Sequence, residues 1–305
     1  LDFSSQVGFL TFIKVCKNVT VVILGITINY INATMIYTFN RHHIFKLNPR
    51  YILFIHLVLN DMIQLTTSIT LFVVSYTLRT IHVYVCLLFM VPAILTTQNT
   101  PLNLAFMAAE CYISVCIPLR YNYICTVKRT YVVIGTIWAI SSASVLPDVF
   151  IIFATEQLEF FHTRVYCNRD TTFRSSYSKS KRDVSHIVLL VVVWLTLFYA
   201  YFRILFVAKA ANAEAKKARN TILLHGCQLL LCMALYVQPM LIQALALAFP
   251  AGLRYTNFLL FITNQVLPRF ANPIIYGLRD KTFRKYFKRY LCTVKSHSKI
   301  SLKVS

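Results

Sequence analysis

Residues 51–75 read YILFIHLVLNDMIQLTTSITLFVVS, an apolar run of membrane length that one carboxylate, Asp61, interrupts near its middle. A helix needs about 20 mostly apolar residues to cross a hydrocarbon core. A bilayer tolerates an ionisable group only where that group is partnered, hydrated or functional. The stretch therefore predicts a transmembrane helix that carries a functional polar group.

Six further segments have the same character. The seven predicted helices cover residues 15–40, 51–75, 83–112, 130–154, 184–208, 220–248 and 255–278. Each run is too long and too continuously apolar for the lipid/lumen alternation of barrel strands. With 57% hydrophobic and 13% charged residues, the composition is that of neither a soluble domain nor a disordered chain. We predict an all-α membrane protein with a seven-transmembrane helix bundle.

The net charge of +21 is distributed unevenly. Short loops on the cytoplasmic side of membrane proteins concentrate Lys and Arg. Here the basic residues follow the first, third and fifth segments and fill the C-terminal tail: Arg41, Lys46, Arg50; Arg120, Lys128, Arg129; Lys209, Lys216, Lys217, Arg219; and the cluster in 279–289. This pattern predicts a multi-pass protein of the plasma membrane with an extracellular N-terminus, and it argues against nucleic acid as a partner.

A second full charge, Arg269, interrupts the seventh segment just before the run NPIIY at 272–276. At about 1.5 Å rise per residue, Asp61 and Arg269 both lie ~14–17 Å from the cytoplasmic ends of their helices. Arg269, Asn272 and Tyr276 share one helix face. We hypothesise that Arg269 pairs with Asp61 in a bidentate contact. In the alternative, Arg269 faces a polar cavity and does not touch Asp61.

Several residues outside the helix interiors have predicted roles. Cys86 and Cys167 are both expected to face an oxidising compartment, where they can form a disulfide. Residues 278–291 alternate aromatic and basic residues and predict a short amphipathic eighth helix on membrane lipids. We divide the chain into a seven-transmembrane domain that includes the eighth helix, 1–291, and a basic cytoplasmic tail, 292–305. Glycosylation of Asn18 and palmitoylation of Cys292 stay open.

The third segment ends MAAECYISVCIPLRY at residues 107–121. Together with Trp138, Pro239 and the 272–276 run, this stretch resembles the rhodopsin-like (class A) G-protein-coupled receptors, and within them the odorant receptors, whose third helix typically ends MAxDRYVAICxPLxY. The stretches VKRT at 127–130 and KKARNT at 216–221 are similar to those of fish odorant receptors in particular. The resemblance covers essentially the whole chain.

The resemblance implies an odorant receptor in which a small molecule activates a heterotrimeric G protein, without enzymatic activity or a cofactor. A non-olfactory receptor of the same class is the alternative. A transporter or channel is disfavoured, because no paired repeats with broken helices are visible. An enzyme is disfavoured because no His/Asp/Glu cluster lies on one membrane face.

By position, the resemblance also implies a ligand pocket among the third, fifth, sixth and seventh helices. Its expected lining is Met90, Ala93, Ile94, Thr97, Gln98, Met240, Ala244, Ile262 and Gln265. Ala93 stands where amine receptors have an aspartate, so the expected ligand is a small apolar or neutral odorant. For any one of these residues, plain helix packing is the alternative. Lys179, Lys181 and Arg182 are expected to form a solvated basic rim beside lipid headgroups at the mouth of the fifth helix; attraction of anionic ligands is the alternative.

The resemblance further implies a set of switch residues. Asp61, Thr100 and Asn272 correspond to the lining of a sodium pocket, where we expect the Arg269 guanidinium to replace the ion. In the triplet Glu110, Cys111 and Tyr112, the family's arginine is replaced by Cys111, which leaves Glu110 without its usual partner. Arg120 is a possible substitute. The remaining expected switch residues are the kink-forming Pro239 and Pro273 and the mobile Tyr276.

Overall fold

The computed structural model describes residues 3–78, 80–208, 258–271 and 282–290, with isolated positions between 220 and 230. Most of the predicted sixth helix and part of the seventh lie outside the described residues. The same holds for several residues with predicted roles: Pro239, Met240, Ala244, Asn272, Pro273, Tyr276 and Cys292. Their roles stay predictions.

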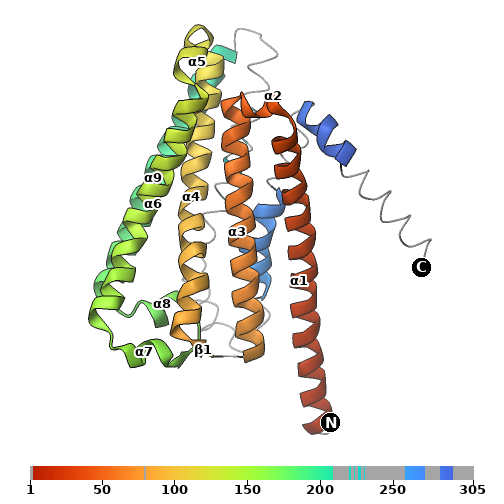
Figure 1. Ribbon diagram of the computed structural model, residues 1–305, viewed down its shortest axis with the longest axis vertical. Coiled ribbons are helices and arrows are strands. Elements are labelled where there is room, and N and C mark those ends of the chain that lie inside the picture. Colours follow the sequence, from red (N-terminus) through yellow and green to blue (C-terminus); the bar gives the residue numbers. More distant parts are fainter. Residues whose placement is uncertain are drawn as a thin grey trace, which may run out of the picture.

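Five long helices run along the bundle (Figure 1): α1 (Phe3–Arg41), α3 (Pro49–Leu78), α4 (Val83–Cys116), α6 (Val127–Thr155) and α9 (Ser176–Ala208). Each contains a stretch that is long and apolar enough to cross a membrane: Val15–Arg41, Pro49–Ser75, Val83–Cys116, Val127–Thr155 and Ser180–Phe206. These stretches confirm the first five predicted spans. A further helical stretch at 258–271, containing the π-helix η2 (Ile262–Val266), occupies part of the predicted seventh span.

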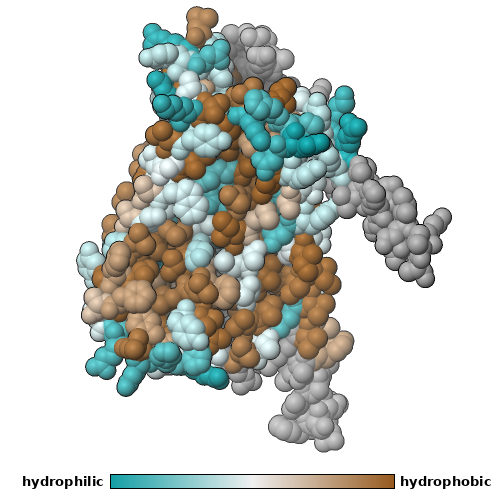
Figure 2. Space-filling view, in the orientation of Figure 1, coloured by the Kyte–Doolittle hydropathy of each residue, from teal (hydrophilic) through white to brown (hydrophobic). Residues whose placement is uncertain are grey.

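The connections gather at two opposite ends of the bundle. The short helices α2 (His43–Lys46) and α5 (Pro118–Ile124) lie at one end, and α7 (Leu158–His162), β1 (Ile81–His82) and the N-terminus lie at the other (Figure 1). In Figure 2, hydrophilic residues cover both ends, and the face between them is largely hydrophobic. The basic residues around α2 and α5 therefore share one end, which we call the basic end.

Local sequence chemistry ends and restarts the helices at this basic end. Asn48 accepts the backbone N–H of Arg50 through Oδ1 at 3.1 Å, directly before α3. Pro118 lies in the first turn of α5, where its missing N–H is tolerated. Thr126 accepts the backbone N–H of Arg129 at 3.3 Å and so caps α6. These caps explain why two short helices, rather than continuous spans, connect the long ones.

The predicted eighth helix is present at residues 282–290, but part of its aromatic face packs on protein. Phe283 is 1% exposed and belongs to an apolar cluster with Phe45 of α2 and Phe54 of α3, and Tyr286 and Phe287 pack against the same cluster. Lys285 and Lys288 are exposed on the other side. The bundle itself therefore covers the ring of Phe283, so this aromatic residue attaches the eighth helix to α2 and α3.

Close approach between α1 and α3 depends on Gly25. A Cβ atom at this position would overlap the side chain of Ile69. Nearby, Asn29 of α1 donates to the hydroxyl of Thr66 on α3 at 2.9 Å. A small residue and an interhelical hydrogen bond are the usual means of joining helices in lipid, where the hydrophobic effect does not drive association.

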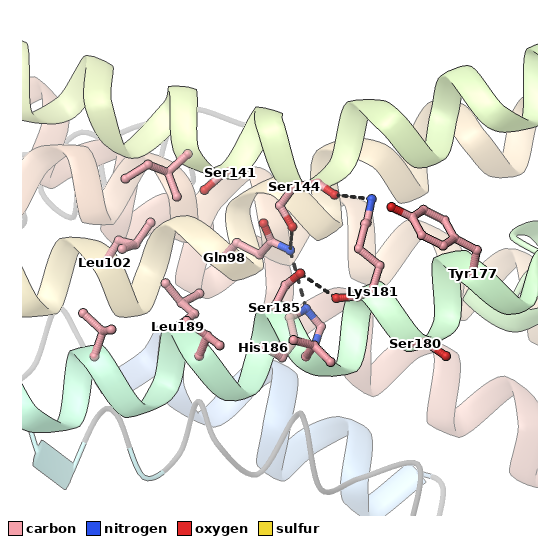
Figure 3. Close-up of a pocket in the computed structure, with 14 residues that line it drawn as sticks. Gln98, Leu102, Ser141, Ser144, Tyr177, Ser180, Lys181, Ser185, His186 and Leu189 are labelled. Carbon is pink, nitrogen blue, oxygen red and sulfur yellow. Dashed lines mark hydrogen bonds between the residues drawn. The ribbon is translucent and has the colours of Figure 1, made fainter.

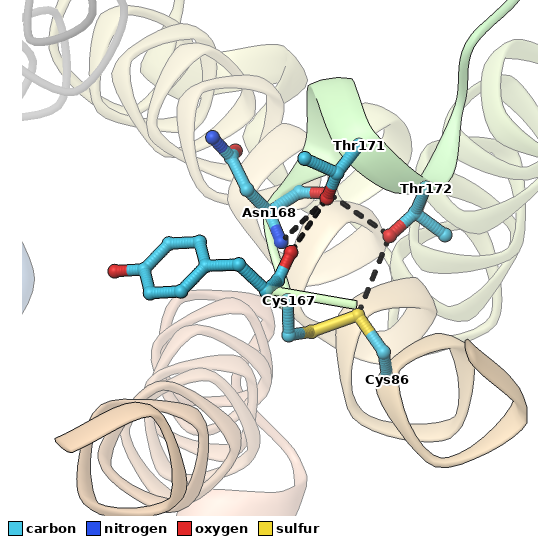
Figure 4. The surroundings of a disulfide bond; sticks show 6 residues. Cys86, Cys167, Asn168, Thr171 and Thr172 are labelled. Carbon is cyan, nitrogen blue, oxygen red and sulfur yellow. Dashed lines mark hydrogen bonds between the residues drawn. A yellow bond between two sulfur atoms is a disulfide. The ribbon is translucent and has the colours of Figure 1, made fainter. Parts of the chain in front are cut away.

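At the end opposite the basic end, the segment between α6 and α9 is attached to the start of α4 (Figure 4). A disulfide joins Cys86 to Cys167, with Cα atoms 5.6 Å apart, as predicted. The strands β1 and β2 (Arg164–Val165) pair antiparallel beside it. The short helix α8 (Arg169–Thr172) follows, and the Thr172 hydroxyl lies 3.4 Å from the Cys86 sulfur. The segment is thus fixed over one end of the bundle.

Removal of this disulfide should impair the receptor at the cell surface. In Cys167→Ser, closure of the long loop is lost, and we expect the surface level to fall at least about fivefold. Flow cytometry of a tagged chain measures this. Cys16→Ser is the matched control, because Cys16 is an exposed free cysteine on α1. Equal surface levels and equal thermal stability for both variants would contradict a stabilising role.

Candidate functional site

A cavity of about 670 Å³ lies between α4, α6 and α9 (Figure 3). Its walls are mostly apolar, with Leu102 of α4, Ile140 of α6 and Leu189 of α9 among them. Cavities of this size with few polar groups are the usual form of small-molecule sites. The cavity is therefore the candidate ligand site in the described part of the chain.

Polar side chains converge on one region of this cavity. Gln98 donates from Nε2 to Ser144 Oγ at 3.2 Å, and the same nitrogen lies 3.5 Å from His186 Nε2. Ser141 is 1% exposed, and its hydroxyl has no hydrogen-bond partner among the described residues. A ligand that offers one hydrogen-bonding group could reach Gln98 and Ser141 while its apolar part contacts the walls.

Lys181, which lines the cavity, forms an ion pair that the sequence analysis missed. Lys181 Nζ lies 2.6 Å from Asp148 Oδ1 and donates to the carbonyl of Ser144 at 3.0 Å. The expectation of a solvated basic rim is wrong for Lys181, because α9 begins at Ser176 rather than 184 and turns this lysine toward α6. Since the two charges compensate each other, the pair adds no net charge to the cavity.

The structure brings only part of the predicted ligand set to this cavity. Of the nine residues, Gln98 lines it. Met90 and Ile94 lie in an apolar cluster with Phe160 and Phe161 of α7, and Ala93 is half-buried on the same helix. The predicted pocket had no contribution from the fourth helix, whereas α6 forms a wall here.

Two further predicted ligand residues meet in a separate polar cluster. Gln64 of α3 donates to Thr97 Oγ1 at 2.6 Å and to Gln265 Oε1 at 3.4 Å. Ile262 packs with Ile28 of α1 and Leu65 of α3. Nothing in these contacts assigns a ligand to the three predicted residues, so their ligand roles stay predictions.

Asp61 and Arg269 meet inside the bundle. Their side chains are each 1% exposed, and Arg269 Nε lies 3.8 Å from Asp61 Oδ1. The alternative in which the two do not approach is therefore excluded. The bidentate contact was wrong, however, because no hydrogen bond joins the two groups at this distance. The two groups therefore form a buried ion pair.

The backbone around Arg269 explains its orientation. Pro268 has no N–H to donate to the carbonyl of Asn264, four residues earlier. The chain forms the π-helix η2 over this stretch. Arg269 Nη1 donates to the Asn264 carbonyl at 2.9 Å. One guanidinium thus satisfies a backbone carbonyl at the proline and places its Nε beside Asp61.

A polar network between α3, α4 and α6 was not recognised in the sequence. Trp138 donates from Nε1 to His56 Nε2 at 3.0 Å, and His56 Nδ1 lies 3.3 Å from Asn103 Oδ1. Because Nε2 accepts from Trp138, the proton of His56 belongs on Nδ1, which donates to Asn103. Asn103 in turn donates to the carbonyl of Leu53 at 3.0 Å. The sequence signal that could have indicated this network is His56 followed four residues later by Asn60, both within an apolar run.

At the basic end, Glu110 has a partner other than the predicted one. Arg50 of α3 donates from Nε to Oε2 and from Nη2 to Oε1, both at 3.0 Å. Arg120 is exposed and forms no ion pair with the described residues. The prediction that Arg120 pairs with Glu110 in place of the family's arginine was therefore wrong. Cys111 packs in an apolar cluster with α9, and the ring of Tyr112 lies 5.6 Å from that of Tyr199. The hydroxyl of Thr100 donates to the Thr96 carbonyl at 3.0 Å.

The helices, the disulfide and the interior charges agree with a single class of membrane protein. The chain belongs to the rhodopsin family of seven-transmembrane receptors, whose profile, described as 7 transmembrane receptor (rhodopsin family), matches residues 31–276. Members of this family are receptors that couple to G proteins, and they are not enzymes.

Among individual proteins, the chain is similar to odorant, olfactory and melatonin receptors. The chain is 31% identical over 281 residues to Odorant receptor 131-2 of Danio rerio, across 90% of this chain and 85% of that protein. It is 26% identical over 265 residues to Olfactory receptor 13C5 of Homo sapiens, covering 80% of each. Melatonin receptor type 1B of Mus musculus is 24% identical over 221 residues, across 66% of this chain and 56% of that receptor.

A sodium ion does not fit beside Asp61 in this member of the family. The guanidinium of Arg269 already lies 3.8 Å from the carboxylate, and both side chains are withdrawn from solvent. A second cation there would be repelled by the first at short range in a medium of low dielectric constant. The residues present are suited to an internal arginine and not to a bound metal ion.

Exchange of the two charges tests the ion pair. Asp61→Asn and Arg269→Gln should each lower surface expression by about tenfold, because each leaves one buried charge uncompensated. The exchanged variant, Asp61→Arg with Arg269→Asp, should recover part of this loss. Surface expression and basal signalling measure the effect, and an exchange no better than the singles would contradict the pairing. Agonist potency of the wild type should not change when sodium is replaced by choline.

Proposed function

We propose that this protein is an odorant receptor that binds a small neutral odorant in the cavity between α4, α6 and α9 and activates a heterotrimeric G protein. The observation that carries the proposal is a largely apolar, charge-compensated cavity at Gln98 in a chain 31% identical to an odorant receptor over most of its length. The Lys181–Asp148 pair and Ala93 both argue against a charged amine as the ligand.

The proposed mechanism is a population shift between two arrangements of the bundle. A ligand that prefers one arrangement favours it by the difference in binding free energy. The cavity borders α9, which packs on α4 through Cys111 and Val193. Bound odorant would thereby bias the packing of α4 and α9 toward the arrangement that a G protein recognises at the basic end.

The proposed setting is the plasma membrane, with the N-terminus and the disulfide outside and the basic end in the cytoplasm. The oxidising exterior supports this orientation for Cys86–Cys167, and the Lys and Arg residues support the cytoplasmic assignment. Residues 1–291 would form the receptor domain and 292–305 a basic tail. Lys285 and Lys288 are exposed, which supports a contact of the eighth helix with anionic lipid headgroups.

Epitope tags test the orientation. A tag ahead of Phe3 should be stained on intact cells, and a tag in the tail should be stained only after permeabilisation, since one end of the bundle faces each side of the bilayer. Immunofluorescence of unpermeabilised and permeabilised cells measures this. A tag ahead of Phe3 that becomes accessible only after permeabilisation would overturn both the orientation and the receptor proposal.

A cell-based odorant screen with a cAMP readout tests the function, with Cys111→Arg examined beside the wild type. For an odorant that carries a hydrogen-bonding group, Gln98→Leu should raise the half-maximal concentration by about 3- to 10-fold, the effect of one lost neutral hydrogen bond. Thr136→Ala is a control on the lipid-facing side of α6, where the Thr136 hydroxyl bonds only its own helix.

Three outcomes separate the candidate functions. Responses to odorants that depend on a G protein support the proposal. Responses to melatonin-like indoles alone would favour a non-olfactory receptor of the same family. A ligand-driven current without a G protein would overturn the proposal in favour of a channel. Equal effects of Gln98→Leu and Thr136→Ala would place the odorant outside this cavity.

A further inference from the structure

A buried carboxylate at the basic end requires a cation that its own helix does not supply. Glu110 is 6% exposed at the cytoplasmic end of α4. The next residue, Cys111, is buried in an apolar cluster and carries no positive charge. A carboxylate withdrawn from water is strongly destabilising unless it is paired and hydrogen-bonded. The charge must therefore be compensated from another element.

Arg50 supplies that charge from the first turn of α3. It contacts both oxygens of Glu110 at 3.0 Å, in the fork geometry specific to arginine and carboxylate. Its Nη2 also donates to Ser114 Oγ at 3.1 Å, and Ser114 donates to the carbonyl of Cys111 at 2.8 Å. The guanidinium is thus bonded to three sites on or near the last turns of α4.

The position of Arg50 is unfavourable for α3 itself. A cation in the first turn of a helix is opposed by the helix dipole. Arg50 nevertheless lies there, with its backbone N–H accepted by Asn48. Its location is therefore explained by the contact with Glu110 and not by stabilisation of the helix that carries it.

A third element joins the same carboxylate. The hydroxyl of Tyr121, on α5, donates to Glu110 Oε1 at 2.9 Å. Burial raises the pKa of Tyr121, and the adjacent Glu110 charge raises it further, so the phenol stays protonated and able to donate at physiological pH. One carboxylate therefore connects α3, α4 and α5.

The orientation of α5 determines which side chains reach the aqueous surface at the basic end. Leu119 is 99% exposed and Tyr123 is 74% exposed. Both belong to a helix of seven residues, which has too few internal hydrogen bonds to be stable alone. Arg129 of α6 donates to the Tyr123 carbonyl at 2.8 Å, and Tyr121 attaches the helix to the Arg50–Glu110 pair. Loss of the second attachment is therefore expected to loosen α5.

We propose that Arg50 is the positioning residue of the cytoplasmic surface. Arg50 lies on α3 and compensates the charge of Glu110, which Cys111 cannot do. Through Glu110 and Tyr121 it also holds α5 in the orientation that a G protein meets. The coupling part of this inference rests on the proposed receptor function. The effect on α5 itself does not, and it can be measured without ligand or G protein.

Limited proteolysis measures the positioning directly. Trypsin cleaves after Arg120, an exposed residue of α5, only when the surrounding backbone opens. In the purified full-length receptor, Arg50→Gln should speed cleavage after Arg120 by about tenfold. Cleavage after Arg174, at the opposite end of the bundle, should keep its rate. Peptide mass spectrometry over a time course distinguishes the two sites.

A series of variants separates positioning from general loss of stability. Arg50→Lys should be intermediate, because lysine keeps the charge but loses the fork contact. The exchanged pair Arg50→Glu with Glu110→Arg should slow cleavage again relative to either single variant. Lys128→Gln is the matched control, an exposed basic residue in the first turn of α6 at the same end of the bundle, and should behave as wild type.

The same variants then test coupling. At equal surface level, Arg50→Gln should lower the maximal cAMP response at least about fivefold while the half-maximal odorant concentration stays within about twofold, since the cavity is not altered. Unchanged cleavage after Arg120 in Arg50→Gln, or an equal change in Lys128→Gln, would overturn the proposal. Faster cleavage in a chain whose wild type answers no odorant would uphold the positioning role and refute the receptor function.

Discussion

The architecture depends on the matching of each buried carboxylate with a cation from another helix. Among the described residues, Glu110 meets Arg50 at the basic end, Asp61 meets Arg269 in the interior, and Asp148 meets Lys181 toward the disulfide end. Hydrocarbon cannot solvate these groups, so an incorrect register between two helices that share a pair would leave a charge uncompensated. The three pairs therefore fix three of the helix contacts: α3 with α4, α3 with the 258–271 stretch, and α6 with α9.

The functional features lie beside these pairs. The candidate ligand cavity contains the Asp148–Lys181 pair in its wall, and the proposed coupling surface is attached to the Glu110–Arg50 pair. Asp61 and Arg269 lie between these two pairs, next to the π-helix η2 that precedes Pro268. A single set of charge pairs thus supports the fold and borders both proposed sites.

The parts of this arrangement that follow from local sequence could be predicted. Apolar length predicted seven spans, of which the described residues confirm five, and distance along each helix placed Asp61 and Arg269 at the same depth. What could not be predicted depends on the reach of side chains between distant elements. Arg120 is closer in sequence to Glu110, yet Arg50 contacts it, because α3 and α4 pack side by side at that level. Likewise, Lys181 was assigned to solvent because the start of α9 was placed about two turns too late.

The paired charges also restrict how this sequence can diverge. A substitution that reverses or removes the charge of Glu110, Asp61 or Asp148 leaves its partner as an uncompensated buried charge, unless that partner is also substituted. Descendants of this chain are therefore expected to retain or replace these positions two at a time. Apart from Lys181, the lining of the cavity carries no charged residue of these pairs, so new ligand preferences can arise at its other positions by independent single substitutions.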